Sequence, residues 1–276
     1  MFPLVPQIPG IEQSGEKTFV ERLEVPARHG FMGIEYQVCD IGKEPAGGVS
    51  SFATDFNLTV TRIATGAMAV KENLSLSEDG EVGKETTAYM KDFVDYAAEF
   101  NEGLILRFIK GKAGHDRKKA SHQFVENISA VIGYVFQKKT PLIIEVTNRY
   151  ETSIATTLAE TADILKVTDN SVSLKESAPL LRILPDTFHM NVEETGIAAE
   201  LYKYTGFFEA VHFSDNNRYL PGYGVIDFKN IITALVEANF SGYIGLEGDF
   251  KDFAQDIVLS CDLLSLIDID KSITQR

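Results

Sequence analysis

Short apolar runs alternate with longer amphipathic segments along the chain. Runs of this length that are followed by polar or turn-forming residues are typical of buried strands. They predict strands at residues 32–38, 58–64, 103–109, 141–147, 180–185, 208–213 and 242–247. A weaker first strand is expected at residues 3–8, where prolines obscure the apolar pattern.

Three of the intervening segments show the 3.6-residue period of a helix with one apolar face. They lie at residues 84–100, 119–137 and 227–238. Strands that alternate with helices imply a parallel sheet with right-handed crossovers. An open doubly wound sheet would fit this alternation as well as a barrel does.

The polar ends of the strands favour the barrel. Four apolar runs end in Glu145, Asp186, His212 and Glu247. The carboxyl ends of all strands of a barrel converge on one face, whereas in an open sheet they form a row. We therefore predict a (β/α)8 TIM barrel in which these four side chains surround one point.

The length of the chain suits one such barrel. A (β/α)8 barrel takes about 250 residues, and the chain has 276 with no linker-like stretch. We expect residues 1–276 to form a single (β/α)8 barrel domain. Residues 74–85 and 168–176 are read as polar loops, and the first is long enough to be a mouth loop or lid.

The four polar strand ends predict a metal site with acid–base chemistry. Carboxylates with one imidazole suit a divalent cation such as Mn²⁺, Mg²⁺ or Co²⁺. Two glutamates on opposite faces of a substrate could remove and return a proton beside a carbonyl. The metal would polarise that carbonyl and hold the developing enediolate.

Each candidate also has a purely structural interpretation. The alternatives are an ion pair of Glu145 with Arg149, a helix cap by Asp186, a loop histidine at His189, a bond from His212 to a backbone carbonyl, and a partnership of Glu247 with the last helix. Their coincidence at successive strand ends favours a shared site.

Three weaker features are expected to be structural. In residues 108–115, Lys110 and Lys112 could bind a phosphate at a helix start, but a turn with solvated lysines is the simpler reading. Glu35 could reach the edge of the site, although an ion pair is expected. The surface histidines are expected to be His29, His115 and His122.

Composition narrows the possible partners and location. The net charge of −14 argues against nucleic acid, whose phosphates favour basic surfaces. Cys39 and Cys261 form no spaced motif, which favours a reduced, cytoplasmic protein. We see no signal peptide and no apolar run long enough for a membrane span.

Three motifs resemble those of the ketose 3-epimerases of the xylose isomerase-like superfamily, which include D-tagatose, D-psicose and L-ribulose 3-epimerases. They are Asp-Thr-Phe-His-Met-Asn-Val-Glu-Glu at 186–194, Glu-Val-Thr-Asn-Arg-Tyr-Glu at 145–151, and His-Phe-Ser-Asp-Asn-Asn-Arg-Tyr-Leu-Pro-Gly-Tyr-Gly at 212–224. The chain departs from the family pattern at Val146, where the family has proline, and in having no tryptophan.

The resemblance implies roles for individual residues. Glu145, Asp186, His212 and Glu247 would bind a divalent metal ion, and both glutamates would exchange the proton at carbon 3 of a ketose. The sugar itself would be bound by Glu151, His189 and Arg218.

Other functions remain open on the same residues. An aldose–ketose or hydroxypyruvate isomerase, or an inosose dehydratase, would need the same metal and base. The related AP endonucleases need additional histidines and a basic DNA-binding face, so we expect no salt-dependent DNA binding. A non-catalytic sugar-binding barrel would not need two opposed glutamates. Relatives commonly form homo-oligomers, and a dimer or tetramer is expected here.

Overall fold

The computed structural model describes residues 2–112, 116–172 and 180–267. Each predicted strand is present, and the strands are all parallel. Their bounds are β1 Leu4–Pro9, β2 Gly33–Gln37, β3 Thr59–Ala64, β4 Gly103–Leu106, β5 Leu142–Glu145, β6 Leu181–Leu184, β7 Ala210–Phe213 and β8 Tyr243–Leu246. Even the proline-containing first strand pairs on both sides, with β2 and β8.

The strands form a nearly closed barrel in the order β6-β5-β4-β3-β2-β1-β8-β7. The seam lies between β6 and β7, which share an isolated parallel bridge between Asp186 and His212 rather than a full ladder. The His212 amide donates to the Pro185 carbonyl at 2.8 Å across this seam. The barrel prediction is therefore confirmed, and the seam closes at two candidate ligands.

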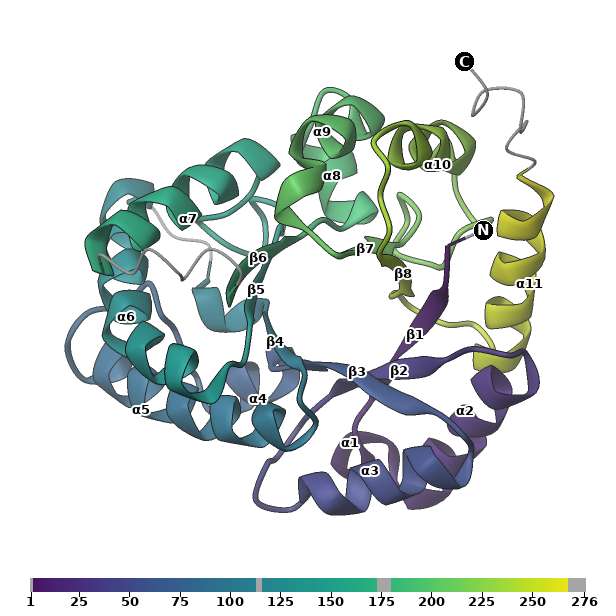
Figure 1. Ribbon diagram of the computed structural model, residues 1–276, viewed down its shortest axis with the longest axis horizontal. Coiled ribbons are helices and arrows are strands. Elements are labelled where there is room, and N and C mark those ends of the chain that lie inside the picture. Colours follow the sequence, from purple (N-terminus) through teal and green to yellow (C-terminus); the bar gives the residue numbers. More distant parts are fainter. Residues whose placement is uncertain (1, 113–115, 173–179, 268–276) are drawn as a thin grey trace.

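The helices surround the barrel (Figure 1). The α-helices are α1 Ile11–Ser14, α2 Glu16–Arg28, α3 Ala46–Asp55, α4 Gly66–Lys71, α5 Gly80–Glu99, α6 Arg117–Lys138, α7 Leu158–Val172, α8 Thr187–Glu193, α9 Ile197–Tyr204, α10 Phe228–Glu237 and α11 Phe253–Leu266, with 3-10 turns η1 Phe108–Lys110 and η3 Thr205–Phe207. Among the described residues, no helix combines the length and apolarity needed to cross a membrane.

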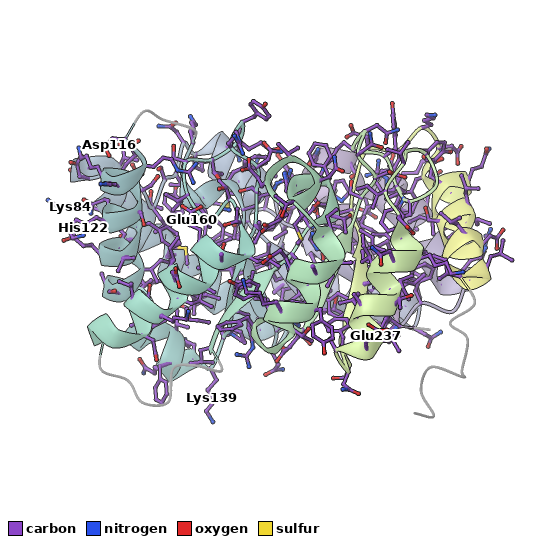
Figure 2. All side chains as sticks on the ribbon, turned by 90° about the horizontal axis from the view of Figure 1, so that it is seen from above. Lys84, Asp116, His122, Lys139, Glu160 and Glu237 are labelled. Atoms are coloured by element: carbon purple, nitrogen blue, oxygen red, sulfur yellow. The ribbon has the colours of Figure 1, made fainter. Side chains whose placement is uncertain are left out.

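Helix α6 shows how the sequence sets these elements and which face carries the site. It begins at Asp116, whose side chain accepts a hydrogen bond from the Lys119 amide, and ends at Lys139 in the left-handed conformation with φ 58°. Figure 2 shows Asp116 at the top and Lys139 and Glu237 at the bottom. Because each helix runs antiparallel to its preceding strand, the carboxyl ends of the strands lie at the top.

The first predicted polar loop, residues 74–85, is partly buried and partly helical. Leu74 and Leu76 are buried, and α5 begins at Gly80. The Ser75 amide donates to the Thr86 hydroxyl, which ties the short connection to the helix. The alternation of leucine and serine buries one side of this connection, so the predicted loop is present at residues 74–79 but ends where α5 begins. In the second predicted loop, α7 continues to Val172, and residues 173–179 lie outside the described residues.

The strands bury two separate apolar surfaces. Side chains such as Ile63, Leu104 and Ile144 face the helices and belong to the main core. Side chains that alternate with them form a smaller cluster inside the barrel: Ala64, Ile105, Ile143, Leu184 and Ala210, with Tyr243 packed against it. Because side chains alternate along a strand, the residues two positions further on also point inward.

We expect a close approach before β8 to make Gly242 sensitive to substitution. A Cβ at this position would lie 1.9 Å from the Glu209 carbonyl oxygen, which is backbone and cannot rotate away. Gly242→Ala should lower the free energy of unfolding by roughly 1–3 kcal/mol because the strand must shift. Urea denaturation measures this loss.

Gly133 in α6 is the matched control, because a Cβ there has no neighbour within 4 Å. Gly133→Ala should be neutral or stabilise the protein by roughly 0.5–1 kcal/mol. Equal destabilisation by the two substitutions would contradict the close packing at the start of β8.

Candidate functional site

A polar layer lies directly above the apolar cluster inside the barrel. Residue pairs two positions apart on the same strands connect the layers: Ile105 and Arg107, Ile143 and Glu145, Leu184 and Asp186, Ala210 and His212. The alternation of a strand therefore delivers each polar side chain to the inside of the barrel at its carboxyl end. Glu247 joins them from the end of β8.

The structure brings the four predicted ligands together. Glu145, Asp186, His212 and Glu247 each offer an oxygen or nitrogen atom, and these atoms all lie within 4.8 Å of one another. All four residues are buried. Their convergence was predicted from sequence, and the structure shows the arrangement without assigning its role.

Glu145 has one carboxylate oxygen without a hydrogen-bond partner. Its buried Oε1 lies 3.6 Å from the Arg107 Nε and 3.7 Å from the His189 Nε2, and all three atoms lack a hydrogen bond. The alternative partner Arg149 instead forms an ion pair with Glu193. The structural interpretation of Glu145 as an ion pair with Arg149 was therefore wrong.

Asp186 serves the helix and the site with different oxygens. Its Oδ1 accepts hydrogen bonds from the Phe188 and His189 amides at the start of α8, so the predicted helix cap is present. Its Oδ2 accepts from Arg218 Nη1 at 2.9 Å. The cap orients the carboxyl group so that the second oxygen faces the cluster.

His212 lies between two carboxylates. Its Nδ1 is 2.7 Å from Glu247 Oε2, and its Nε2 is 2.6 Å from Glu35 Oε2. Tyr243 donates a further hydrogen bond to Glu35 at 2.7 Å. Glu35 thus holds the imidazole from the far side and leaves Nδ1 facing the cluster, as carboxylates commonly do behind metal-binding histidines. A bond to a backbone carbonyl, the structural interpretation of His212, does not form.

Glu247 is paired with arginines rather than with the last helix. Arg107 and Arg218 both donate to its Oε1. The helix that follows, α11, is capped instead by Asp252. The helix-partner interpretation of Glu247 was therefore wrong.

The three predicted sugar-binding residues surround the same cluster. His189 is fully buried, and its Nδ1 accepts from the Asn148 amide at 3.2 Å, which places the proton on Nε2. Glu151 is partly exposed, with an Oε2 3.3 Å from Arg107 Nη2. Arg218 has a left-handed backbone conformation with φ 69°, and its guanidinium pairs with Asp186 and Glu247. Such strain in a non-glycine residue is frequent at functional sites.

Sequence reasoning missed two cations in the polar layer. Arg107 is an inward-facing residue two positions after Ile105, and this spacing could have revealed it. Lys110 is fully buried, and its Nζ donates to the Glu145 carbonyl and to the Thr147 hydroxyl at 2.6 Å. The expectation of a solvated lysine was therefore wrong for Lys110. It was correct for Lys112, which is exposed. His115, which was expected to be a surface histidine, lies outside the described residues.

The surroundings shift the pKa values of Glu145 and Glu247 in opposite directions. Burial, with the neighbouring charge of Glu247, raises the pKa of Glu145 to about 8. Burial also opposes ionisation of Glu247, but Arg107 and Arg218 outweigh it and hold its pKa well below the usual range. For His212, burial is likewise outweighed, here by Glu35 and Glu247, so its pKa is raised.

A divalent cation fits the donor set. Three carboxylates and one imidazole converge, and these ligand types suit hard or borderline dications. Two guanidinium groups already pair with Asp186 and Glu247, so cationic charge is favourable at this cluster. The partnerless Glu145 Oε1 and His189 Nε2 leave a buried acceptor and donor for a further ligand.

Comparisons with known proteins identify a family. The family model described as "Xylose isomerase-like TIM barrel" matches residues 23–258. A 3-dehydro-D-guloside 4-epimerase of Escherichia coli (strain K12) is 33% identical over 138 residues, 49% of this chain and 47% of that protein. A ketose 3-epimerase of Arthrobacter globiformis is 26% identical over 220 residues, 75% of this chain and 71% of that protein.

A solved structure of an AP endonuclease, family 2, from Brucella melitensis superposes with a TM-score of 0.77 at 17% identity, covering 95% of this chain and 99% of that one. This likeness shows a shared fold only. The aligned part of the Escherichia coli relative spans about half of that protein's length, 47%.

We predict that Asp186→Asn weakens divalent-metal binding while the helix cap remains. Asparagine caps helices as well as aspartate does, so loss of the charge on Oδ2 is the main change. The affinity for Mn²⁺, measured by calorimetry, should fall by roughly 10- to 100-fold. The control is Asp252→Asn, the same change at the cap of α11, which should bind Mn²⁺ as the wild type does.

The raised pKa of Glu145 predicts how the stability of the metal-free protein depends on pH. The folded state holds this proton up to about pH 8, whereas the ordinary carboxyl pKa is 4.5. The contribution of Glu145 to stability is therefore fully present below pH 4.5 and is lost as the pH rises towards 8. Glu145→Gln should remove this loss.

The measurement is urea denaturation with a chelator at about pH 5 and about pH 8. On going from about pH 5 to about pH 8, the free energy of unfolding of Glu145→Gln should increase by a few kcal/mol relative to that of the wild type. Glu237→Gln, at the opposite end of the barrel, should show no such gain. A stability difference between Glu145→Gln and wild type that does not change with pH would contradict the buried, protonated carboxyl.

Proposed function

The chain belongs to the xylose isomerase-like TIM-barrel family, and from that premise we propose that it is a divalent-metal-dependent epimerase of ketoses that acts at carbon 3. Both curated relatives described above carry the name of a sugar epimerase, which supports the reaction class. Residues 186–194 and 145–151 carry the resemblance to ketose 3-epimerases. This resemblance supports carbon 3 as the position of the reaction.

The observation that carries the proposal is the meeting of two glutamates from different strands in one buried cluster. Ligand atoms of Glu145 and Glu247 belong to a group that lies within 4.8 Å. Inversion beside a carbonyl needs one group that removes the proton and another that returns it from the opposite side. Glu145 and Glu247, which reach the cluster from the ends of two different strands, supply two carboxyl groups for such an exchange.

A divalent cation held by Glu145, Asp186, His212 and Glu247 would supply Lewis acidity to the carbonyl beside the reacting carbon. The chemistry of these ligands favours Mn²⁺, Mg²⁺ or Co²⁺. Neither Asp186 nor His212 is assigned a proton transfer in this scheme. Their role is to complete the ligand set, with Glu35 fixing the orientation of the imidazole.

The remaining residues would orient the sugar. The His189 Nε2 proton is buried without an acceptor, so it can donate to a substrate oxygen. Arg218 offers guanidinium donors on the same side as Asp186 and Glu247. Glu151 is partly exposed and can accept a hydrogen bond from a hydroxyl group.

The test is deuterium exchange followed by NMR, with Mn²⁺-loaded protein, heavy water and a panel of ketoses. We expect deuterium to enter at carbon 3 together with the new epimer. Glu145→Gln and Glu247→Gln should each reduce the rate by roughly 10²- to 10⁴-fold, the usual contribution of general acid–base catalysis. Glu237→Gln, exposed at the far end of the barrel, is the matched control and should keep the wild-type rate.

Two results would replace the proposal. Exchange at carbon 1 or 2 would make the protein an aldose–ketose isomerase on the same metal site. If Mn²⁺ binds and no ketose exchanges at any carbon, the proposed substrate class is wrong, and dehydration of an inosose or sugar binding alone would take its place.

A further inference from the structure

A cavity of about 400 Å³ opens next to the metal-ligand cluster and is lined by three arginines. Arg107, Arg218 and Glu247 come from the site already described, and Arg22 comes from α2. Its volume lies within the roughly 300–1,000 Å³ typical of small-molecule sites. The cavity therefore connects the proposed reaction centre with a positive charge that the proposed function does not use.

We infer that the substrate of this site is an anionic ketose, whose carboxylate or phosphate group is held by Arg22 while the rest of the sugar occupies the cavity beside Glu247. The inference rests on the proposed function and adds a substrate class to it. Carboxylate and phosphate offer arginine the same chemistry, an anionic group with several acceptor oxygens.

Arg22 differs from the other two arginines because it has no carboxylate partner among the described residues. Its Nη1 donates to the Ser14 hydroxyl at 2.9 Å, and its guanidinium lies 5.7 Å from the centre of the Phe253 ring. The side chain is half-buried, and burial lowers its pKa. A partly desolvated cation without a counter-charge is stabilised most by an anion.

The other lining groups match the remainder of a sugar. Gln7, Gln13 and Gln37 also face the cavity, and amide side chains can both donate to and accept from hydroxyl groups. A guanidinium only donates. The cavity thus combines groups suited to hydroxyls with one unpaired group suited to a negative charge.

The charge of the cavity contrasts with that of the whole protein. The chain has 26 lysines and arginines against 40 acidic residues, yet three guanidinium groups and only two carboxylates, Glu247 and Asp249, line this cavity. Arg107 and Arg218 pair with the proposed metal ligands Glu145, Asp186 and Glu247, and Arg107 also pairs with Glu151. Sharing those carboxylates with a dication would leave the cavity more positive, which favours an anionic substrate.

The experiment compares ketohexoses that differ only at carbon 6. Neutral D-fructose, D-fructuronate and D-fructose 6-phosphate, and the corresponding forms of the other ketohexoses, are tested by deuterium exchange at carbon 3. The wild type should have a kcat/KM about 10- to 100-fold higher for one charged form than for the neutral sugar, as expected for one charge-assisted contact. Whether the carboxylate or the phosphate is preferred identifies the anion.

Arg22→Gln should remove this preference by raising the KM for the charged sugar by about 10- to 100-fold, with the neutral sugar unaffected. Arg28→Gln is the matched control because Arg28 lies on the same helix, is exposed and pairs with Glu24. The inference is overturned if neutral ketoses are preferred, or if Arg22→Gln affects charged and neutral sugars equally. Both results would leave the epimerase proposal intact.

A binding measurement separates failure of the inference from failure of the proposed function. Inorganic phosphate is titrated into chelator-treated protein and followed by ³¹P NMR. Binding to wild type and Arg28→Gln but not to Arg22→Gln supports the anion site even if no ketose exchanges. Absence of phosphate binding, together with absence of exchange on charged ketoses, overturns the anion site.

Discussion

The structure depends on the balance of charge among carboxylates buried at the carboxyl ends of the strands. Glu145, Asp186 and Glu247 converge inside the barrel, where isolated negative charges are costly. Arg107 and Arg218 reduce that cost by pairing with them. The same buried negative charge makes the cluster suited to a divalent cation. The three buried carboxylates therefore destabilise the fold and also supply the ligands for the proposed chemistry.

Closure of the barrel and assembly of the site are physically linked. The β6–β7 seam has a single bridge, between Asp186 and His212, and both residues belong to the proposed ligand set. A cation bound by residues on both sides of the seam would join two strands that share few backbone hydrogen bonds. Metal binding is therefore expected to stabilise the folded barrel, since a ligand that binds only the folded state favours it.

Groups that do not line the cavity form hydrogen bonds to residues of the polar layer. Glu35 and Tyr243 hold His212 from the interior of the barrel, and Lys110 donates to the Glu145 carbonyl. The first contacts orient the His212 imidazole, and the last one satisfies the backbone carbonyl at the end of β5. Arg22 stands apart from this network, because its contacts are a hydroxyl group and an aromatic ring.

The sequence by itself determined the strand–helix alternation and the candidate ligands, because strand periodicity and polar strand ends are local patterns. Only the tertiary structure decided how these residues pair. The sequence left Glu145 free to pair with Arg149, whereas the folded chain places it beside Arg107. It also suggested a solvated Lys110, which the structure buries, and gave no sign of Arg22. Ion pairing and burial depend on contacts between distant segments, which no local pattern encodes.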